Sequence, residues 1–453
     1  MDMRLLDTTT FELASNSSSV FKQDGYAILS HRWIDSEITF EQLGGHVDAL
    51  RAAGDTPLES PQQEKIRGAC QIARARGIRW MWIDTCCIDK SSTAELSESL
   101  NSMFKWYRDA KLCITYLLDV IRKGVGKEDF TNEADHPSVW FSRGWTLQEL
   151  LAPRHLEFFD KDWDPIGNRA ELSEQIQQIT GIHSKYLKGD TRHDFRAACI
   201  ATKFSWIASR QTERDEDMAY SILGLFGVTM DPRYGEGWGA FMRLQRELLS
   251  ISKDESLFAW KMMQPDAGLK LLSGVHTRRQ DKWRENEWGL LAPRPVCFKD
   301  CGQMTITCPW FLKWYIPRPE GGVQMRQQGL QITFGSHPFN PFLEASSDRR
   351  LLLTCGSVIL CIVTAGYSVI MQILEARAMT YKDFQYTLNC WDRNEMGNMV
   401  PVRIWLRVVN QDGSKTRILK RVRCTDVMQG REGVMPGRTK SSGIVLQPWM
   451  LAS

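Results

Sequence analysis

The order of apolar and polar positions predicts strands that alternate with helices over the first third of the chain. Short apolar runs of strand length occur at Tyr26–Ser30, Ile78–Ile83, Lys111–Leu118 and His155–Phe159, after a short N-terminal arm. Amphipathic stretches with helical spacing follow them at Thr39–Arg51, Gln62–Arg76, Ser92–Tyr107 and Trp145–Leu151. Such alternation is typical of parallel βαβ units with helices on both faces. We therefore expect an α/β fold, flavodoxin-like, with a mostly parallel sheet.

The pattern changes twice further along the chain. Helical spacing dominates at Ala170–Ile179, Phe195–Ser209, Asp217–Phe226 and Trp238–Leu249. Beyond that, glycine, proline and β-formers increase, with short runs at Gly329–Phe334, Phe384–Asn389 and Val402–Val409, and a hairpin turn at Gln411–Ser414. The pattern predicts an α/β domain with its arm at residues 1–165, a helical extension at 166–262 and a β-rich domain at 263–453.

Composition narrows the class of protein. The chain has 453 residues, and a single hydrophobic core does not usually support a chain of that length. Its net charge is +3 and it has no long Lys/Arg run, which argues against nucleic acid as a partner. The 12 cysteines lack the regular spacing of a disulfide framework and favour reduced thiols in a cytoplasmic setting. Cys297, Cys301 and Cys308 have no CxxC pair or nearby His, so no metal site is expected.

The ends of the chain and one long apolar run bear on membrane association. The first residues lack the apolar core of a signal peptide. Leu351–Leu374 carries no charge and has the length of a membrane span. Its glycines, serines and threonines dilute the apolar character, so buried β structure is favoured over a span.

Polar side chains gather where two of the predicted strands end. Asp84, Cys87, Asp89 and Lys90 follow the strand that ends at Ile83, and the sequence Ser30-His31-Arg32-Trp33 ends another. Because ligands of open α/β sheets bind beyond the carboxyl ends of the strands, we expect these residues to form a site if the two strands are parallel neighbours.

Two interpretations of this edge stay open. Arg32 and Lys90 can face a phosphate while Trp33 stacks on a base or a nicotinamide ring. Alternatively, Arg32 and Lys90 pair with Asp84 and Asp89 and only hold the loops together, which the sequence alone favours. Neither a GxGxxG fingerprint nor a P-loop is present, which argues against the ordinary dinucleotide and nucleoside-triphosphate folds.

The segment Trp140–Leu150 is a second focus, and Arg143, Trp145 and Glu149 are its candidate site residues. On a helix, Trp145 and Glu149 share a face, and a carboxyl beside an indole can have a raised pKa suited to acid or base catalysis. The alternative is that Thr146 and Glu149 form a capping box at the start of the helix, and spacing alone favours that cap.

Two further patterns have a structural and a chemical interpretation. Cys87 and His31 can form a thiol–imidazole pair, but a buried, unreactive cysteine is the commoner case. The acidic residues of Arg214–Asp217 precede an apolar helix and are typical of a solvated helix start.

Taken together, these segments resemble the fungal heterokaryon-incompatibility (HET) domain family. The matching stretches are Tyr26–Trp33, Trp82–Lys90, Ser102–Ala110, Arg143–Pro153, Asp217–Phe226, Tyr234–Gly237 and Ser256–Trp260. The first loop departs from the family pattern, since Arg32, Trp33 and Ile34 stand where a small residue and then Trp-Gly are usual.

The resemblance implies a role as effector or sensor in fungal non-self recognition and programmed cell death, with self-association and other incompatibility proteins as partners. It also implies a distant relation to the Toll/interleukin-1 receptor (TIR) fold, many members of which hydrolyse NAD with a glutamate in a Trp-x-x-x-Glu setting. Trp145 to Glu149 matches that setting, so Glu149 is the implied catalytic residue, with NAD as substrate and no cofactor required. The rival expectation is a non-catalytic interaction module that recruits partners.

Overall fold

The computed structural model divides the chain into two compact units, which are described separately. It describes residues 3–15, 24–34, 36–54, 56–121, 130–132, 134–189, 194–262, 290–306, 323–326, 329–333, 383–394, 397, 399–409, 418–422, 428–429 and 443–446. The first unit comprises residues 1–198 and 206–240, and the second comprises residues 199–205 and 241–453. The three domain boundaries expected from the sequence stay predictions.

The first unit is built on a seven-stranded sheet in the order β2-β1-β4-β3-β5-β6-β7. Its strands are β1 (Arg4–Asp7), β2 (Leu13–Ser15), β3 (Tyr26–His31), β4 (Trp80–Trp82), β5 (Leu112–Tyr116), β6 (Leu156–Phe159) and β7 (Pro165–Asn168). The central strands β4, β3, β5 and β6 are parallel, and the outer strands pair antiparallel. If the four central strands are numbered in chain order, they lie in the order 2-1-3-4 of a doubly wound sheet. Successive strands are added toward one edge up to β4 and toward the other edge from β5 onward, so the strand order reverses between β3 and β5. The predicted α/β fold is confirmed.

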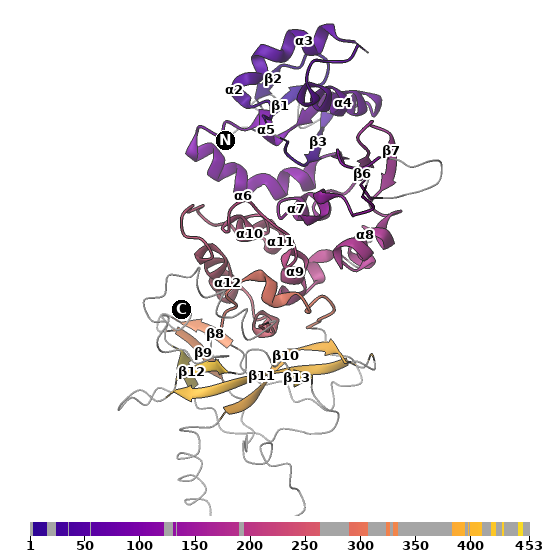
Figure 1. The fold of residues 1–453 in the computed structure, drawn as a ribbon. Helices are drawn as coiled ribbons and strands as arrows, with labels where there is room; N and C mark the ends of the chain where they lie inside the picture. Colours follow the sequence, from indigo (N-terminus) through magenta and orange to yellow (C-terminus); the bar gives the residue numbers. More distant parts are fainter. Residues whose placement is uncertain are drawn as a thin grey trace, which may run out of the picture. The chain divides into compact units, whose positions relative to one another are not determined.

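Helices cover both faces of this sheet (Figure 1). They are α2 (Phe40–Leu43), α3 (Val47–Ala52), α4 (Pro61–Ala75), α5 (Asp84–Cys87), α6 (Thr93–Asp109) and α7 (Thr146–Leu151). Helix α4 covers one face, while α6 and α7 lie together on the other. Side-chain caps start the two longest, since Ser60 Oγ accepts from Gln63 N and Ser92 Oγ accepts from Glu95 N.

The expected elements are present, with a few differences. The segment expected as one helix over 39–51 is interrupted at Gly44 and Gly45, because glycine has a low helix propensity. The polar exit after Ile83 is a helical turn, α5, rather than a loop. The antiparallel edge strand β7 was not expected. The helical stretch contains α8 (Ser173–Thr180), α9 (Ile200–Ile207), α10 (Asp217–Tyr220), α11 (Leu223–Phe226) and α12 (Gly239–Ile251).

The second unit is rich in antiparallel β structure, as predicted. One sheet contains β10 (Asp383–Arg393), β11 (Met399–Val409), β12 (Ile418–Val422) and β13 (Met428–Gln429). The other contains β8 (Val323–Arg326), β9 (Gly329–Thr333) and β14 (Gly443–Leu446). The predicted turn at Gln411–Ser414 and the apolar run Leu351–Leu374 lie outside the described residues. Within the described residues, every helix is too short or too polar to cross a bilayer.

Helix α4 can pack closely on the turn between β6 and β7 because it carries Gly68 at the contact. A Cβ at Gly68 would lie 2.2 Å from the ring of Trp163, and that ring stacks on Tyr116 at 4.3 Å between centroids. We expect Gly68→Ala to lower the free energy of unfolding by about 1–3 kcal/mol through overpacking, measured by urea denaturation.

Gly45→Ala is the matched control, because nothing lies within 4 Å of a Cβ at that position. Its stability should stay close to that of the wild type. If the two variants prove equally stable, the close packing of α4 against Trp163 is wrong.

Candidate functional site

The candidate site lies at the edge of the sheet where the strand order reverses. Strand β3 ends there in Ser30 and His31, α5 brings Asp84 from the end of β4, and α7 brings Glu149. Ser30 Oγ donates to Glu149 Oε2 at 2.5 Å, and His31 Nε2 lies 2.9 Å from Asp84 Oδ1. The three segments that the sequence analysis singled out therefore meet at one place.

Glu149 is a buried carboxyl that joins α7 to β3. The indole Nε1 of Trp140 donates to Ser30 Oγ at 3.0 Å, and Ser30 in turn donates to Glu149. The residue is only 7% exposed. Burial, with a smaller contribution from the charge of Asp84, raises the pKa of Glu149 to about 8 against the opposing effects of Ser30, Tyr107 and Arg143. Glu149 is therefore mostly protonated at neutral pH.

The alternative role of Glu149 as a helix cap is wrong. Helix α7 begins at Thr146, and its N-cap residue, Trp145, makes no side-chain cap. The hydroxyl of Thr146 is directed to the carbonyl oxygens of Trp140 and Arg143, at 2.6 and 2.9 Å. Glu149 thus turns away from the start of its own helix and binds the neighbouring strand.

Asp84 and His31 form a second part of the site, in which the carboxyl is ionised. Although burial alone would raise it, hydrogen bonds from His31 and Trp33 and the charge of Lys90 hold the pKa of Asp84 at about 2. Burial and the charge of Lys65 lower the pKa of His31, so its ring is neutral. An ionised Asp84 only accepts, so His31 Nε2 carries the proton and Nδ1 keeps a lone pair. That Nδ1 atom is buried and has no hydrogen-bond partner.

A buried ion pair between Lys65 and Glu37 acts on the pKa of His31 through its charges, and the sequence analysis missed it. The ammonium group of Lys65 contacts Glu37 Oε1, and both side chains are largely buried. Glu37 also accepts from Ile34 N at 2.7 Å, which fixes the loop after β3. The available signal was that Lys65 lies on the buried stripe of α4, beside Ile66 and Ala69, where an unpaired lysine is costly.

The rim of the site consists of Trp33, Lys90 and Arg32. Trp33 is 40% exposed and its Nε1 donates to Asp84 Oδ2 at 2.8 Å. Lys90 Nζ lies 3.6 Å from the centroid of the Trp33 ring, a cation–π contact. Arg32 is exposed. The loop-holding interpretation is thus only partly right, since the hydrogen bonds to Asp84 come from His31 and Trp33 rather than from Arg32 or Lys90.

The remaining candidates lie further from the carboxyls. Asp89 accepts from Ser91 Oγ at 2.6 Å. Cys87 Sγ accepts from Ile83 N at 3.4 Å, while His31 binds Asp84, so the thiol–imidazole pair is not formed. Arg143 lies 3.6 Å from Glu213 and acts on Glu149 only through its charge.

The acidic segment 214–217 is only half solvated, so its interpretation as a solvated helix start is only partly right: Arg214 and Asp215 are exposed, whereas Glu216 and Asp217 are buried. Glu216 is buried and accepts from the backbone N–H groups of Gly235 and Gly237, at 2.7 and 2.9 Å. Asp217 accepts from Tyr234 Oη at 3.0 Å and from the indole of Trp145. These contacts anchor the start of α7, which the spacing of Trp145 and Glu149 alone did not indicate.

Two buried arginines, also missed from sequence, hold the ends of α7. Arg210 Nη1 donates to Arg143 O at 2.9 Å and to Thr146 Oγ1 at 3.0 Å. Arg169 Nη1 donates to Leu150 O at 2.6 Å. The position of Glu149 is therefore fixed from both sides of its helix.

Comparisons with known proteins find two family models that match parts of this chain. Residues 26–138 match the family described as heterokaryon incompatibility protein (HET), and residues 239–310 match a domain of unknown function, DUF8212. The vegetative incompatibility protein HET-E-1 of Podospora anserina is 40% identical over 243 residues, which cover 52% of this chain and 16% of that protein. No solved structure matches the chain.

The resemblance to the HET family is therefore confirmed over residues 26–138, which match its family model. Glu149 lies beyond the last residue matched by that family model. The relation to the TIR fold stays a prediction.

The raised pKa of Glu149 predicts a pH-dependent stability. Between its ordinary pKa of 4.5 and its folded value of about 8, the folded chain binds a proton that the unfolded chain has lost. The contribution of Glu149 to the free energy of unfolding is thus complete at low pH. It is lost as pH rises through this range, by up to about 1.4 kcal/mol per pH unit. Glu149→Gln should remove this slope, which urea denaturation from about pH 5 to about pH 8 measures.

Glu41→Gln, on the exposed side of α2, is the matched control and should keep the wild-type slope. Parallel pH profiles for the wild type and Glu149→Gln would show that Glu149 does not titrate in this range.

Proposed function

We propose that this chain, whose residues 26–138 match the HET family, acts as an effector of fungal non-self recognition and programmed cell death by hydrolysing NAD. The name of the similar protein, a vegetative incompatibility protein, supports the biological role. The chain spans 16% of that protein, so the role is carried over from a part of it. The chemistry is argued from the site itself.

The observation that carries the enzymatic proposal is a pair of neighbouring carboxyl groups whose pKa values are driven apart. The pKa of Asp84 is lowered to about 2 and that of Glu149 is raised to about 8, and the charge of Asp84 contributes to the rise at Glu149. Near pH 7 one is therefore an anion and the other a neutral acid. Such divergent pairs are typical of catalytic acids and bases.

This pair suits cleavage of the bond between nicotinamide and ribose. When that bond breaks, its electron pair moves to the nicotinamide nitrogen, and positive charge develops on the ribosyl group. The Asp84 carboxylate stabilises that charge, while the protonated Glu149 donates a hydrogen bond to a ribose hydroxyl. Water then adds to the ribosyl carbon, and His31 Nδ1 accepts the proton that it releases.

The rim residues provide the remaining contacts for NAD. The indole of Trp33 offers a face on which a nicotinamide or adenine ring stacks, and Lys90 places a positive charge beside it for phosphate. The Asp84 side chain is 17% exposed, and Glu149 is more deeply buried, so the site is nearly closed. In the proposal, self-association or binding of another incompatibility protein favours an open form.

A non-catalytic interaction module is the second candidate. One observation favours it: the hydrogen bond from Ser30 to Glu149 joins α7 to β3 and needs no reaction to explain it. In that case the exposed Trp33 belongs to a surface that recruits partners.

The two candidates predict different results for NAD turnover. Under the enzymatic proposal, the full chain releases nicotinamide from NAD when it is concentrated enough to associate. Glu149→Gln and Asp84→Asn each lower the rate by about 100-fold or more, because each removes a group that acts on the reacting ribose. Chromatographic measurement of nicotinamide, with sedimentation to follow association, tests this.

Glu41→Gln should keep full activity, since Glu41 is an exposed carboxyl that is not among the residues of the proposed site. Circular dichroism shows whether each variant folds. An associated wild type that leaves NAD intact would favour the interaction module. Full turnover by a folded Glu149→Gln would exclude Glu149 from the chemistry.

A further inference from the structure

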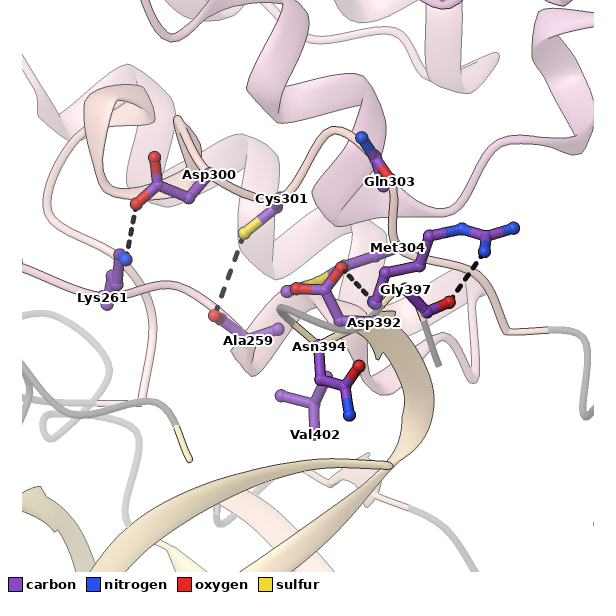
Figure 2. A pocket seen from close by; sticks show the side chains of 11 residues that line it. Ala259, Lys261, Asp300, Cys301, Gln303, Met304, Asp392, Asn394, Gly397 and Val402 are labelled. Atoms are coloured by element: carbon purple, nitrogen blue, oxygen red, sulfur yellow. Dashed lines mark hydrogen bonds and ion pairs between the residues drawn. The ribbon is translucent and has the colours of Figure 1, made fainter. Parts of the chain in front are cut away.

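The second unit contains a cavity that the proposed function does not use. Its volume is about 490 Å³, within the range of small-molecule sites. It is lined by Ala259, Lys261, Asp300, Cys301, Gln303, Met304, Asp392, Arg393, Asn394, Gly397 and Val402 (Figure 2). The lining residues from Ala259 to Met304 belong to the segment that matches the domain of unknown function.

The floor of the cavity is apolar and firmly held. Ala259, Cys301, Met304 and Val402 are all buried. Thr202 Oγ1 lies within hydrogen-bonding distance of the carbonyl oxygens of Cys301 and Met304, at 3.1 and 3.0 Å, and donates its single proton between them. The next residue, Thr305, exchanges backbone hydrogen bonds with Trp391 of β10, at 3.0 and 2.9 Å. The cavity is therefore formed by fixed backbone and needs little rearrangement to accept a ligand.

Charged groups stand at two opposite sides of this floor (Figure 2). On one side, Lys261 Nζ lies 2.5 Å from Asp300 Oδ2. On the other, Asp392 and Arg393 follow each other at the end of β10, and Arg393 Nη1 donates to Gly397 O at 2.9 Å. Each side offers one cation and one carboxylate.

The charged groups are accessible to a ligand. The side chains of Lys261 and Asp300 are 36% and 48% exposed, and exposed ion pairs contribute little stability, so a ligand carboxylate can replace Asp300 at small cost. The four charges sum to zero, which disfavours polyanions such as nucleotides. A ligand with separated opposite charges and an apolar part matches both the rim and the floor.

We propose that this cavity binds a small zwitterion with an apolar side chain, either a free amino acid or a dipeptide. The ligand carboxylate binds Lys261, its ammonium group binds Asp392, and its side chain packs on Met304 and Val402. This site lies in the second unit and shares no residue with the proposed NAD site, so each proposal can fail alone.

The free amino acids are first compared by the thermal shift that each gives the full chain. Isothermal titration calorimetry of the full chain with the dipeptide Ala-Leu then tests the proposal. Ala-Leu should bind, and either N-acetyl-Ala-Leu or Ala-Leu amide should bind at least about tenfold more weakly, because each loses one charge contact. Lys261→Met and Asp392→Asn should weaken Ala-Leu binding to a similar extent. Nicotinamide release is measured separately on the same samples.

Lys253→Met is the matched control, because Lys253 is exposed and does not line the cavity. It should bind Ala-Leu as tightly as the wild type does. The proposal is overturned if neither the amino acids nor Ala-Leu bind, if the capped peptides bind equally well, or if Lys261→Met and Lys253→Met behave alike.

Discussion

The first unit depends on the burial of one carboxyl group between β3 and α7. Removing a carboxylate from water costs several kcal/mol, and the chain meets this cost by keeping the proton on Glu149 and supplying a hydrogen bond from Ser30. Loss of that bond would remove one hydrogen bond from a buried polar group, at about 0.5–1.5 kcal/mol. The contact that fixes α7 on the sheet therefore also places an acid where the strand order reverses.

Asp84 shows how a different environment gives a carboxyl group the protonation state opposite to that of Glu149. It lies nearer the rim, and two donors, His31 and Trp33, face its oxygens while Lys90 adds positive charge. Glu149 lies deeper, and burial dominates there. Two carboxyls at one sheet edge thus hold one negative charge near pH 7, and His31 faces the charged one with a free lone pair on its other nitrogen.

The sequence predicted the strands and the polar exits well, because apolar runs and strand ends are local patterns. It did not predict how Glu149 is used, since a Thr three residues before a Glu looks the same whether the carboxyl caps its own helix or binds Ser30, 119 residues away. The same limit applies to Lys65 with Glu37 and to Arg210 with α7, which are pairings between distant segments. Only the buried stripe of α4 gave a local sign that Lys65 had a partner.

The choice between enzyme and interaction module turns on why a carboxyl, rather than an amide, occupies position 149. A glutamine there could accept the bond from Ser30 equally well and would carry no pH-dependent cost of burial. The carboxyl adds nothing to the contact with β3, and it makes the fold sensitive to pH through a pKa of about 8. Under the enzymatic proposal, that proton is available to a substrate hydroxyl beside an ionised Asp84 and a His31 with an open Nδ1. The physical cost of the group therefore favours chemistry over scaffolding.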